Sequence, residues 1–227
     1  MTKLNDTKLL SYTENPVWIS FPVTIIWMQN QRNKFNSLHD FEKIRGINIT
    51  IILLSAACVE GFLVECLMTY VIGNRFVSSE TDEGKAKQDL YKRISQATFG
   101  DFRELFREIL GKTISECINE PSLIEGILAL IDFRNGVAHA RSVVYEKFGN
   151  MFKNTETNKV GNQYKTVHDY LEKNKLICTQ GDLFVSDISD HFSNLIKPYI
   201  IKVLSLLPSP QSDNVKTLVD IAFKEQP

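Results

Sequence analysis

The chain has 227 residues, and its 26 Lys and Arg against 27 Asp and Glu give a net charge of -1 at pH 7. This balance excludes a protein that grips nucleic acid through an overall basic field, so any nucleic-acid contact must be local. Hydrophobic residues make up 43% of the chain, enough for the core of one large domain. The segment 134–175 holds eight basic and four acidic residues, so the positive charge is concentrated there.

The cysteines and the N-terminal residues bear on the cellular compartment. The four cysteines form no CxxC pair and are too widely spaced for a zinc site, so we expect reduced, buried thiols. The stretch 1–16 has no apolar core typical of a secretory signal, and we expect a cytoplasmic protein. No cofactor and no metal ion are expected.

The predicted elements begin with segment 17–31. It is rich in β-branched and aromatic residues and contains Pro22, which predicts a short strand or extended arm leading into a helix. A long apolar helix follows over 47–72. This helix is long enough to cross a bilayer, but Glu60 and Glu65 lie near its middle, where carboxylates are costly. We therefore expect a buried helix of a soluble bundle and no membrane contact.

The middle of the chain alternates polar and helical patterns. The polar stretch 78–88 predicts a loop, and helices are predicted over 87–98 and 101–110. Asp101 is expected to cap the second of these helices and Gly111 to end it.

The second half continues the helical pattern. Pro121 opens an apolar helix that leads the chain to Arg134. The remaining predictions are a surface loop or frayed helix end over 148–163, an amphipathic helix over 166–177, a hairpin over 178–186 and a closing helix over 187–207.

Together these elements predict an all-α (mainly α) fold. The prediction is a helical bundle over 46–207 with a small β-hairpin, a mixed N-terminal arm over 1–45 and a C-terminal tail over 208–227.

The stretch DFRNGVAHAR, residues 132–141, follows the apolar helix and carries a guanidinium, an amide and an imidazole. RNA cleavage without a metal needs a base for the ribose 2′-OH, an acid for the leaving 5′ oxygen and positive charge on the phosphate. Histidine transfers protons near neutral pH, and a general acid or base of this kind raises the reaction rate by about 10²–10⁴-fold. Arginine holds two phosphate oxygens and keeps its charge. Arg134 and His139 supply these two groups, and Asn135 adds an amide that can bind the phosphate or the imidazole.

The spacing of the pair has a geometric consequence. An offset of five residues rotates two side chains about 140° apart on a regular helix. Either Gly136 loosens the helix so that Arg134 and His139 converge, or the site is composite, formed with the same residues of a second copy across a two-fold axis.

RNGVAH resembles the R-N-x-x-x-H form of the Rx4-6H motif of HEPN domains. The long early helix SAACVEGFLVECL is similar to these domains as well, and the resemblance covers roughly residues 45–205. It implies a helical bundle, commonly dimeric, of a family with many metal-independent endoribonucleases in toxin–antitoxin and antiviral systems. Arg134 and His139 would be catalytic and Asn135 a polar helper. The chain lacks an adjoining nucleotidyltransferase-like motif, and neither residues 1–45 nor the hairpin match the pattern.

We therefore expect an endoribonuclease that leaves 2′,3′-cyclic phosphate products. Its partners would be RNA, a second copy of the chain and an antitoxin or regulatory protein. Arg141 and nearby lysines would bind the RNA strand, and the carboxylate of Glu60 would orient the motif side chains. Other accounts stay open, because Arg134 can be an ion-pair partner of Glu60 or Glu65, Asn135 a helix-boundary residue and His139 a core histidine.

A second match to the motif, RNKFNSLH, spans residues 32–39. Arg32 is expected in a polar connector, whereas Arg134 follows an apolar helix of the bundle, and we favour the latter. His168 and Asp169 form half of a metal-phosphohydrolase signature, and we expect an exposed helical dipeptide there. His191, beside Asp190, offers metal ligands or a solvated face.

Two further interpretations concern nucleic acid. The aromatic residues Phe148, Phe152 and Tyr164 alternate with lysines and could stack RNA bases or anchor a loop. A rival function is a DNA-binding regulator that uses 166–177 and the hairpin, although no basic recognition helix precedes that hairpin. The main rival is a non-catalytic dimer of the same fold that binds a partner.

Overall fold

The computed structural model describes residues 17–35, 40–73, 81–138, 158–176, 183–207 and 211–224. Every regular element within these residues is helical, which confirms the all-α expectation. The elements are the short 3-10 helix η1 (Val17–Ile19) and the α-helices α1 (Ser20–Arg32), α2 (Phe41–Gly73), α3 (Asp82–Ser95), α4 (Phe99–Leu110), α5 (Ile114–Cys117), α6 (Pro121–Ala138), α7 (Asn158–Lys173), α8 (Ser186–Leu204) and α9 (Gln211–Ala222).

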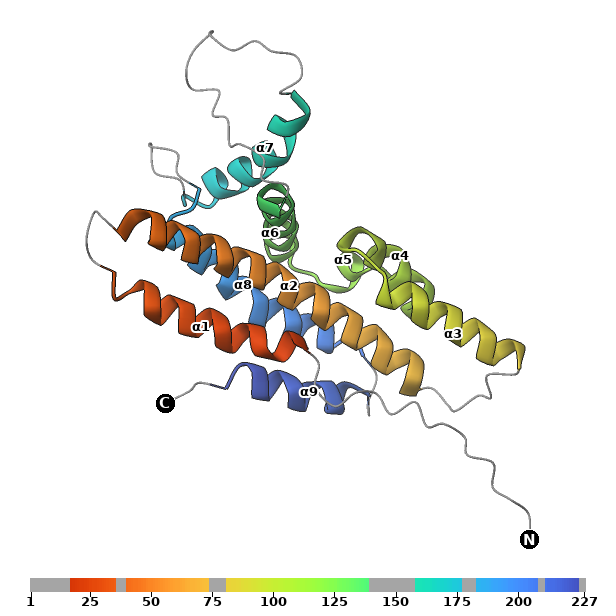
Figure 1. Cartoon of the computed structure of the whole chain (residues 1–227). Coiled ribbons are helices and arrows are strands. Elements are labelled where there is room, and N and C mark those ends of the chain that lie inside the picture. The colour runs from red at the N-terminus through yellow and green to blue at the C-terminus, as the bar shows by residue number, and fades with distance from the viewer. Residues whose placement is uncertain are drawn as a thin grey trace.

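The helix α2 is the centre of the bundle. It runs through the middle of the molecule, with α1 and α8 packed along it and α9 beneath them (Figure 1). Its sequence is apolar around almost the whole circumference, so it can bury side chains against several neighbours at once. Fully buried side chains along α2 include Ile51, Ile52, Phe62, Leu63 and Leu67.

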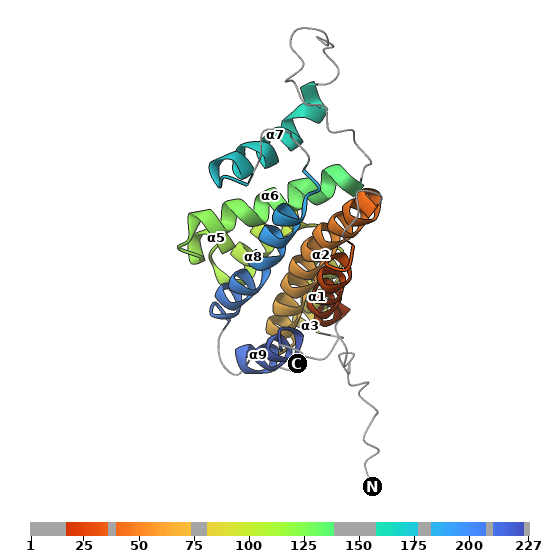
Figure 2. The same ribbon diagram turned by 90° about the vertical axis from the view of Figure 1, so that its left-hand side faces the viewer.

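The helix α6, which carries the motif, crosses α2 steeply and lies between α2 and α7 (Figure 2). Its buried side chains include Ile127, Leu130 and Phe133, and α8 also packs against it. The helices α3, α4 and α5 gather at the C-terminal end of α2 (Figure 1). The motif therefore lies on a helix that the core holds from several sides.

The strand or extended arm predicted within 17–31 is wrong, because the chain is helical from Val17 to Arg32. Pro22 lies in the first turn of α1, where its missing N–H has no partner within the helix. Trp18 and Ile25 are buried in the core with α2, and this packing outweighs the β-propensity of the segment.

Two helix starts also differ from the prediction. The loop predicted over 78–88 is wrong from Asp82, where α3 begins. The side chain of Thr81 caps that helix by accepting the Gly84 N–H at 3.1 Å. Asp101 is not the cap of α4, because Thr98 holds that position and Asp101 instead accepts its N–H at 2.8 Å. Gly111 ends α4 as predicted, with a φ of 75°.

The predicted hairpin over 178–186 is not seen in the described residues. Residues 178–182 lie outside them, 183–185 form bends, and α8 begins at Ser186. Within the predicted tail, 208–227, the structure has the helix α9, which buries Val215 and Val219 against the bundle.

One segment of α2 is long and apolar enough to cross a membrane. It spans Phe41–Val71, and half of its most apolar window is buried inside the bundle. The core helix of a soluble protein meets the same criterion, so the segment is weak evidence for a membrane.

Candidate functional site

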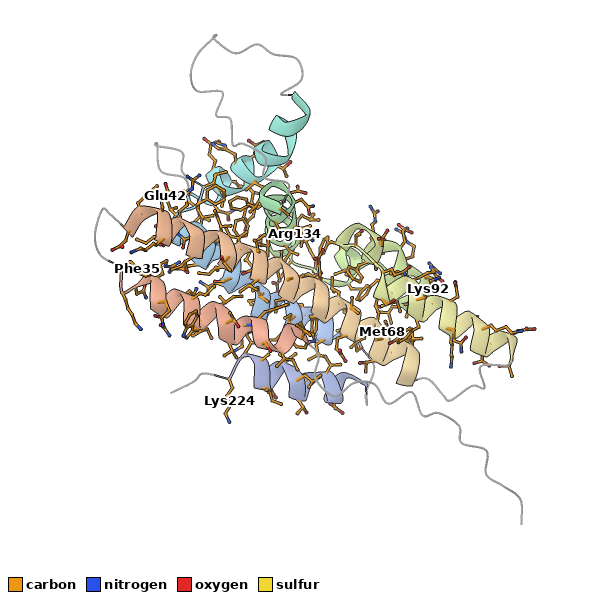
Figure 3. All side chains as sticks on the ribbon, in the orientation of Figure 1. Phe35, Glu42, Met68, Lys92, Arg134 and Lys224 are labelled. Atoms are coloured by element: carbon orange, nitrogen blue, oxygen red, sulfur yellow. The ribbon has the colours of Figure 1, made fainter. Side chains whose placement is uncertain are left out.

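Arg134 lies near the C-terminal end of α6, where this helix passes α2 (Figure 3). Its Nη2 donates a hydrogen bond to Oε1 of Glu60, a residue in the middle of α2. The Arg134 and Glu60 side chains keep 27% and 25% of their surface exposed. The ion pair is therefore partly buried, but both groups can be reached from solvent.

The guanidinium of Arg134 is not fully satisfied. Its Nε is buried and has no hydrogen-bond partner among the described residues. An unsatisfied buried donor costs about 1–3 kcal/mol. Arg134 therefore keeps one donor that the described part of the fold does not use.

The rest of the motif is only partly described. Asn135 is half-buried and Gly136 is buried, and α6 continues through both residues to Ala138. Over this part, Gly136 does not interrupt the helix, contrary to the first of the two geometries considered for the motif. His139 and Arg141 lie outside the described residues, as do Phe148, Phe152 and the side chain of Tyr164.

Asp132 is a candidate that the sequence analysis missed. It is half-buried on α6, and burial raises the pKa of its carboxyl group. Asp132 precedes Asn135 by three residues and position 139 by seven, which are spacings of one helix face. This periodicity was present in the sequence and could have identified Asp132.

The second motif match has a different environment. Arg32 is not in a connector as predicted but is the last residue of α1, and only 6% of its side chain is exposed. It donates to Oδ1 of Asn48 at 2.9 Å, to Oγ of Ser189 at 2.9 Å and to Oδ2 of Asp190 at 2.6 Å. Arg32 therefore joins α1, α2 and α8, and its donors are taken up by the fold.

Other members extend this network. Ser189 donates to Oδ1 of Asn48 at 3.0 Å, and the amide of Asn48 donates to the carbonyl of Phe184 at 2.8 Å. Gln29 donates to Oδ1 of Asp190 at 2.7 Å. The polar groups in the network satisfy one another, as buried polar groups generally must.

The remaining histidine candidates lie near α7. His191 shares a hydrogen bond of 2.8 Å with the hydroxyl of Tyr170, and burial lowers the pKa of its imidazole. Because Asp190 is paired with Arg32, the side chains of Asp190 and His191 are not arranged around a common metal position. His168, Asp169 and Glu172 could hold a metal ion, since their ligand atoms lie within 4.8 Å of one another, but both carboxylates are exposed.

A separate cavity of about 230 Å³ lies where α4, α5, α6 and α8 meet. Its lining is mainly apolar and includes Phe102, Ile127 and Tyr199, with Arg103 and Ser115 among the exposed residues. Arg134 does not line it. The cavity and the motif are therefore distinct features of α6.

Among the predicted site residues, the structure brings Arg134 of α6 and Glu60 of α2 into contact, and Asn135 is the next residue after Arg134 on α6. Comparison with known proteins adds no assignment, because no family model, curated protein or solved structure matches the chain.

Proposed function

We propose that this chain is a metal-independent endoribonuclease of the HEPN type that acts as a homodimer in a toxin–antitoxin or antiviral setting. The observation that carries the proposal is the contrast between the two arginines of the R-N-x-x-x-H pattern. Arg32 is enclosed by partners from two other helices, α2 and α8, whereas the Arg134 side chain keeps 27% of its surface exposed and has one hydrogen-bond partner, Glu60, among the described residues.

In this mechanism the phosphate replaces solvent at the exposed edge of Arg134. Glu60 holds Nη2 and fixes the direction of the guanidinium, so the remaining N–H groups can meet two phosphate oxygens. His139 takes the proton of the 2′-OH, and the 2′ oxygen attacks phosphorus. The 5′ oxygen then leaves with a proton, and the product is a 2′,3′-cyclic phosphate.

A dimer supplies what one subunit lacks. The reaction needs a base and an acid, and each chain offers one histidine in the motif. In a regular helix, positions 134 and 139 diverge by about 140°, so a second copy related by a two-fold axis is the simpler source of the missing group. Asn135 and Arg141 would position the strand, and an antitoxin or regulatory protein would control access.

The first experiment is RNA cleavage in EDTA. Wild type should cleave labelled single-stranded RNA and leave cyclic phosphate ends, while Arg134→Ala and His139→Ala should lose about 10²-fold or more of the rate. Arg103→Ala, on the exposed surface of α4, is the matched arginine control and should keep full activity. Cleavage that survives both motif substitutions would remove the assignment.

A mixing experiment tests the composite site. If each site combines Arg134 of one subunit with His139 of the other, Arg134→Ala and His139→Ala chains complement each other. Random pairing makes half of the dimers mixed, each with one intact site, so about a quarter of the wild-type activity should return. No recovery in verified mixed dimers would mean either that Arg134 and His139 act within one subunit or that one site needs both histidines of the dimer.

One observation favours a non-catalytic alternative. The Glu60–Arg134 ion pair neutralises the guanidinium and could be a purely structural link between α2 and α6. In that case the chain would be a partner-binding dimer of the same fold. Glu60→Gln distinguishes the two, because loss of an orienting carboxylate lowers cleavage, whereas loss of a structural link lowers the melting temperature alone.

A further inference from the structure

Arg45, on the first turns of α2, differs from every other arginine that the structure describes. Six arginines lie among the described residues, and five have a carboxylate within 4.0 Å. Arg45 has none within that distance among the described residues, and its buried Nε lacks any hydrogen-bond partner there. It is half-buried, so the fold holds a positive charge that it does not neutralise.

An aromatic ring fixes this charge close to the motif helix. The guanidinium of Arg45 lies over the ring of Phe184, 4.9 Å from its centroid. The Phe184 ring in turn lies 5.4 Å from the ring of Phe133, the residue directly before Arg134. A single ring therefore separates Arg45 from the turn of α6 that carries the motif.

The position of Phe184 is itself fixed. Its carbonyl accepts the Asn48 amide at 2.8 Å, and Asn48 belongs to the buried network around Arg32. Phe184 is only 8% exposed. The ring that supports Arg45 is therefore held by the core, and the guanidinium lies on a rigid platform.

We propose that Arg45 binds a backbone phosphate of the RNA strand next to the one that is cleaved, an inference that rests on the proposed ribonuclease function. A guanidinium with one face on an aromatic ring keeps its edge free for phosphate oxygens. Preorganisation on the ring also reduces the entropy lost when the strand binds. The substrate class is single-stranded RNA that extends past the cleaved linkage, so Arg45 contributes to strand affinity and Arg134 to the chemical step.

The test measures binding separately from cleavage. The probe is a labelled single-stranded RNA oligonucleotide that is 2′-O-methylated, because it cannot be cleaved by attack of the 2′ oxygen. Its dissociation constant is measured in EDTA over a range of salt concentrations for wild type, Arg45→Gln and Arg103→Gln. Arg103 is the control, since it is an exposed arginine of α4 that pairs only loosely with Glu104 at 4.0 Å.

Loss of one phosphate contact should weaken binding by Arg45→Gln about tenfold at moderate salt. It should also flatten the dependence of log K on log salt by about 0.7, the value for one phosphate on a single strand. Arg45→Lys keeps the charge and should keep most of the slope. A structural role alone would change the melting temperature and leave the slope unaltered.

The outcomes separate the two proposals. If wild type binds and cleaves RNA but Arg45→Gln matches it in slope and affinity, or Arg103→Gln loses as much, the role of Arg45 is refuted and the ribonuclease stands. If wild type neither binds nor cleaves RNA, both fall. Should Arg45→Gln fail to fold, Arg45→Met keeps the packing over Phe184 without the charge and is judged by the same slope.

Discussion

Replacing Arg32 with Met should unfold the bundle far more easily while sparing the proposed chemistry. The substitution keeps an unbranched side chain in place but removes the donors of three hydrogen bonds, at 2.6, 2.9 and 2.9 Å. Removing one partner of a fully buried ion pair costs about 3–5 kcal/mol, but Asp190 keeps 35% of its side chain exposed, so the loss here should be smaller, about 2–4 kcal/mol. The cost does not reach the sum of three charged hydrogen bonds, because Asn48 still accepts from Ser189 and Asp190 still accepts from Gln29.

For a chain of this size, each kcal/mol lowers the melting temperature by about 2–4 °C, so Arg32→Met should melt roughly 4–16 °C below wild type. Thermal unfolding followed by circular dichroism measures this shift, and urea unfolding gives the free energy. Arg103→Met is the matched control and should stay within about 0.5 kcal/mol of wild type.

The comparison with Arg134 completes this test. Below its melting temperature, Arg32→Met should cleave RNA at the wild-type rate per folded molecule, while Arg134→Met should lose cleavage and keep most of its stability. A loss of less than about 1 kcal/mol for Arg32→Met would show that its network contributes little to stability, contrary to its burial. Loss of cleavage by the folded Arg32→Met protein would make the second motif match functional.

Three further predictions concern packing, pH and thiol chemistry. Gly126→Ala should lower the free energy of unfolding by about 1–3 kcal/mol, because the added Cβ would lie 2.6 Å from atoms of α7 and α8. The added Cβ of Gly46→Ala would meet nothing within 4 Å, so this control should be neutral or stabilising. Urea unfolding compares the two variants. Burial lowers the pKa of the His191 imidazole, so the unfolded chain binds a proton at this residue more readily than the folded chain. The free energy of unfolding should therefore be full above the ordinary pKa of 6.5 and fall as the pH drops below it. A steeper fall in His191→Gln than in wild type would contradict this expectation. Burial raises the pKa of Cys58 to about 12 and that of Cys66 well above its usual range, so mass spectrometry should find neither alkylated before global unfolding.

Much of the fold follows from local pattern. The central helix α2 and the start of α6 at Pro121 are predictable because apolar periodicity and helix-boundary residues are local properties. The segment of α1 misleads because its β-branched and aromatic residues favour strands in isolation. Its burial against α2 is a tertiary effect, and no window of the sequence contains it.

For the candidate site as well, the local sequence pattern identifies some residues, and tertiary contacts decide the rest. The motif residues stand out in the sequence, and Glu60 is one of two carboxylates that the pattern offers to Arg134. Choosing between Glu60 and Glu65 requires the crossing of α6 over α2, a contact between residues 74 positions apart. The hydrogen bonds of Arg32 itself span up to 158 positions, so a local search could describe that residue only as part of a polar connector.

The packing of α2 against α8 has a consequence for synthesis of the chain. A ribosome finishes α2 and then must add about 130 residues before α8 is complete, which takes roughly 7–26 s at about 5–20 residues per second. Throughout that interval the nascent α2 exposes an apolar surface that only a later segment can cover. A chaperone that binds exposed apolar segments is therefore expected to bind the emerging polypeptide at α2 and to release it once α8 is complete.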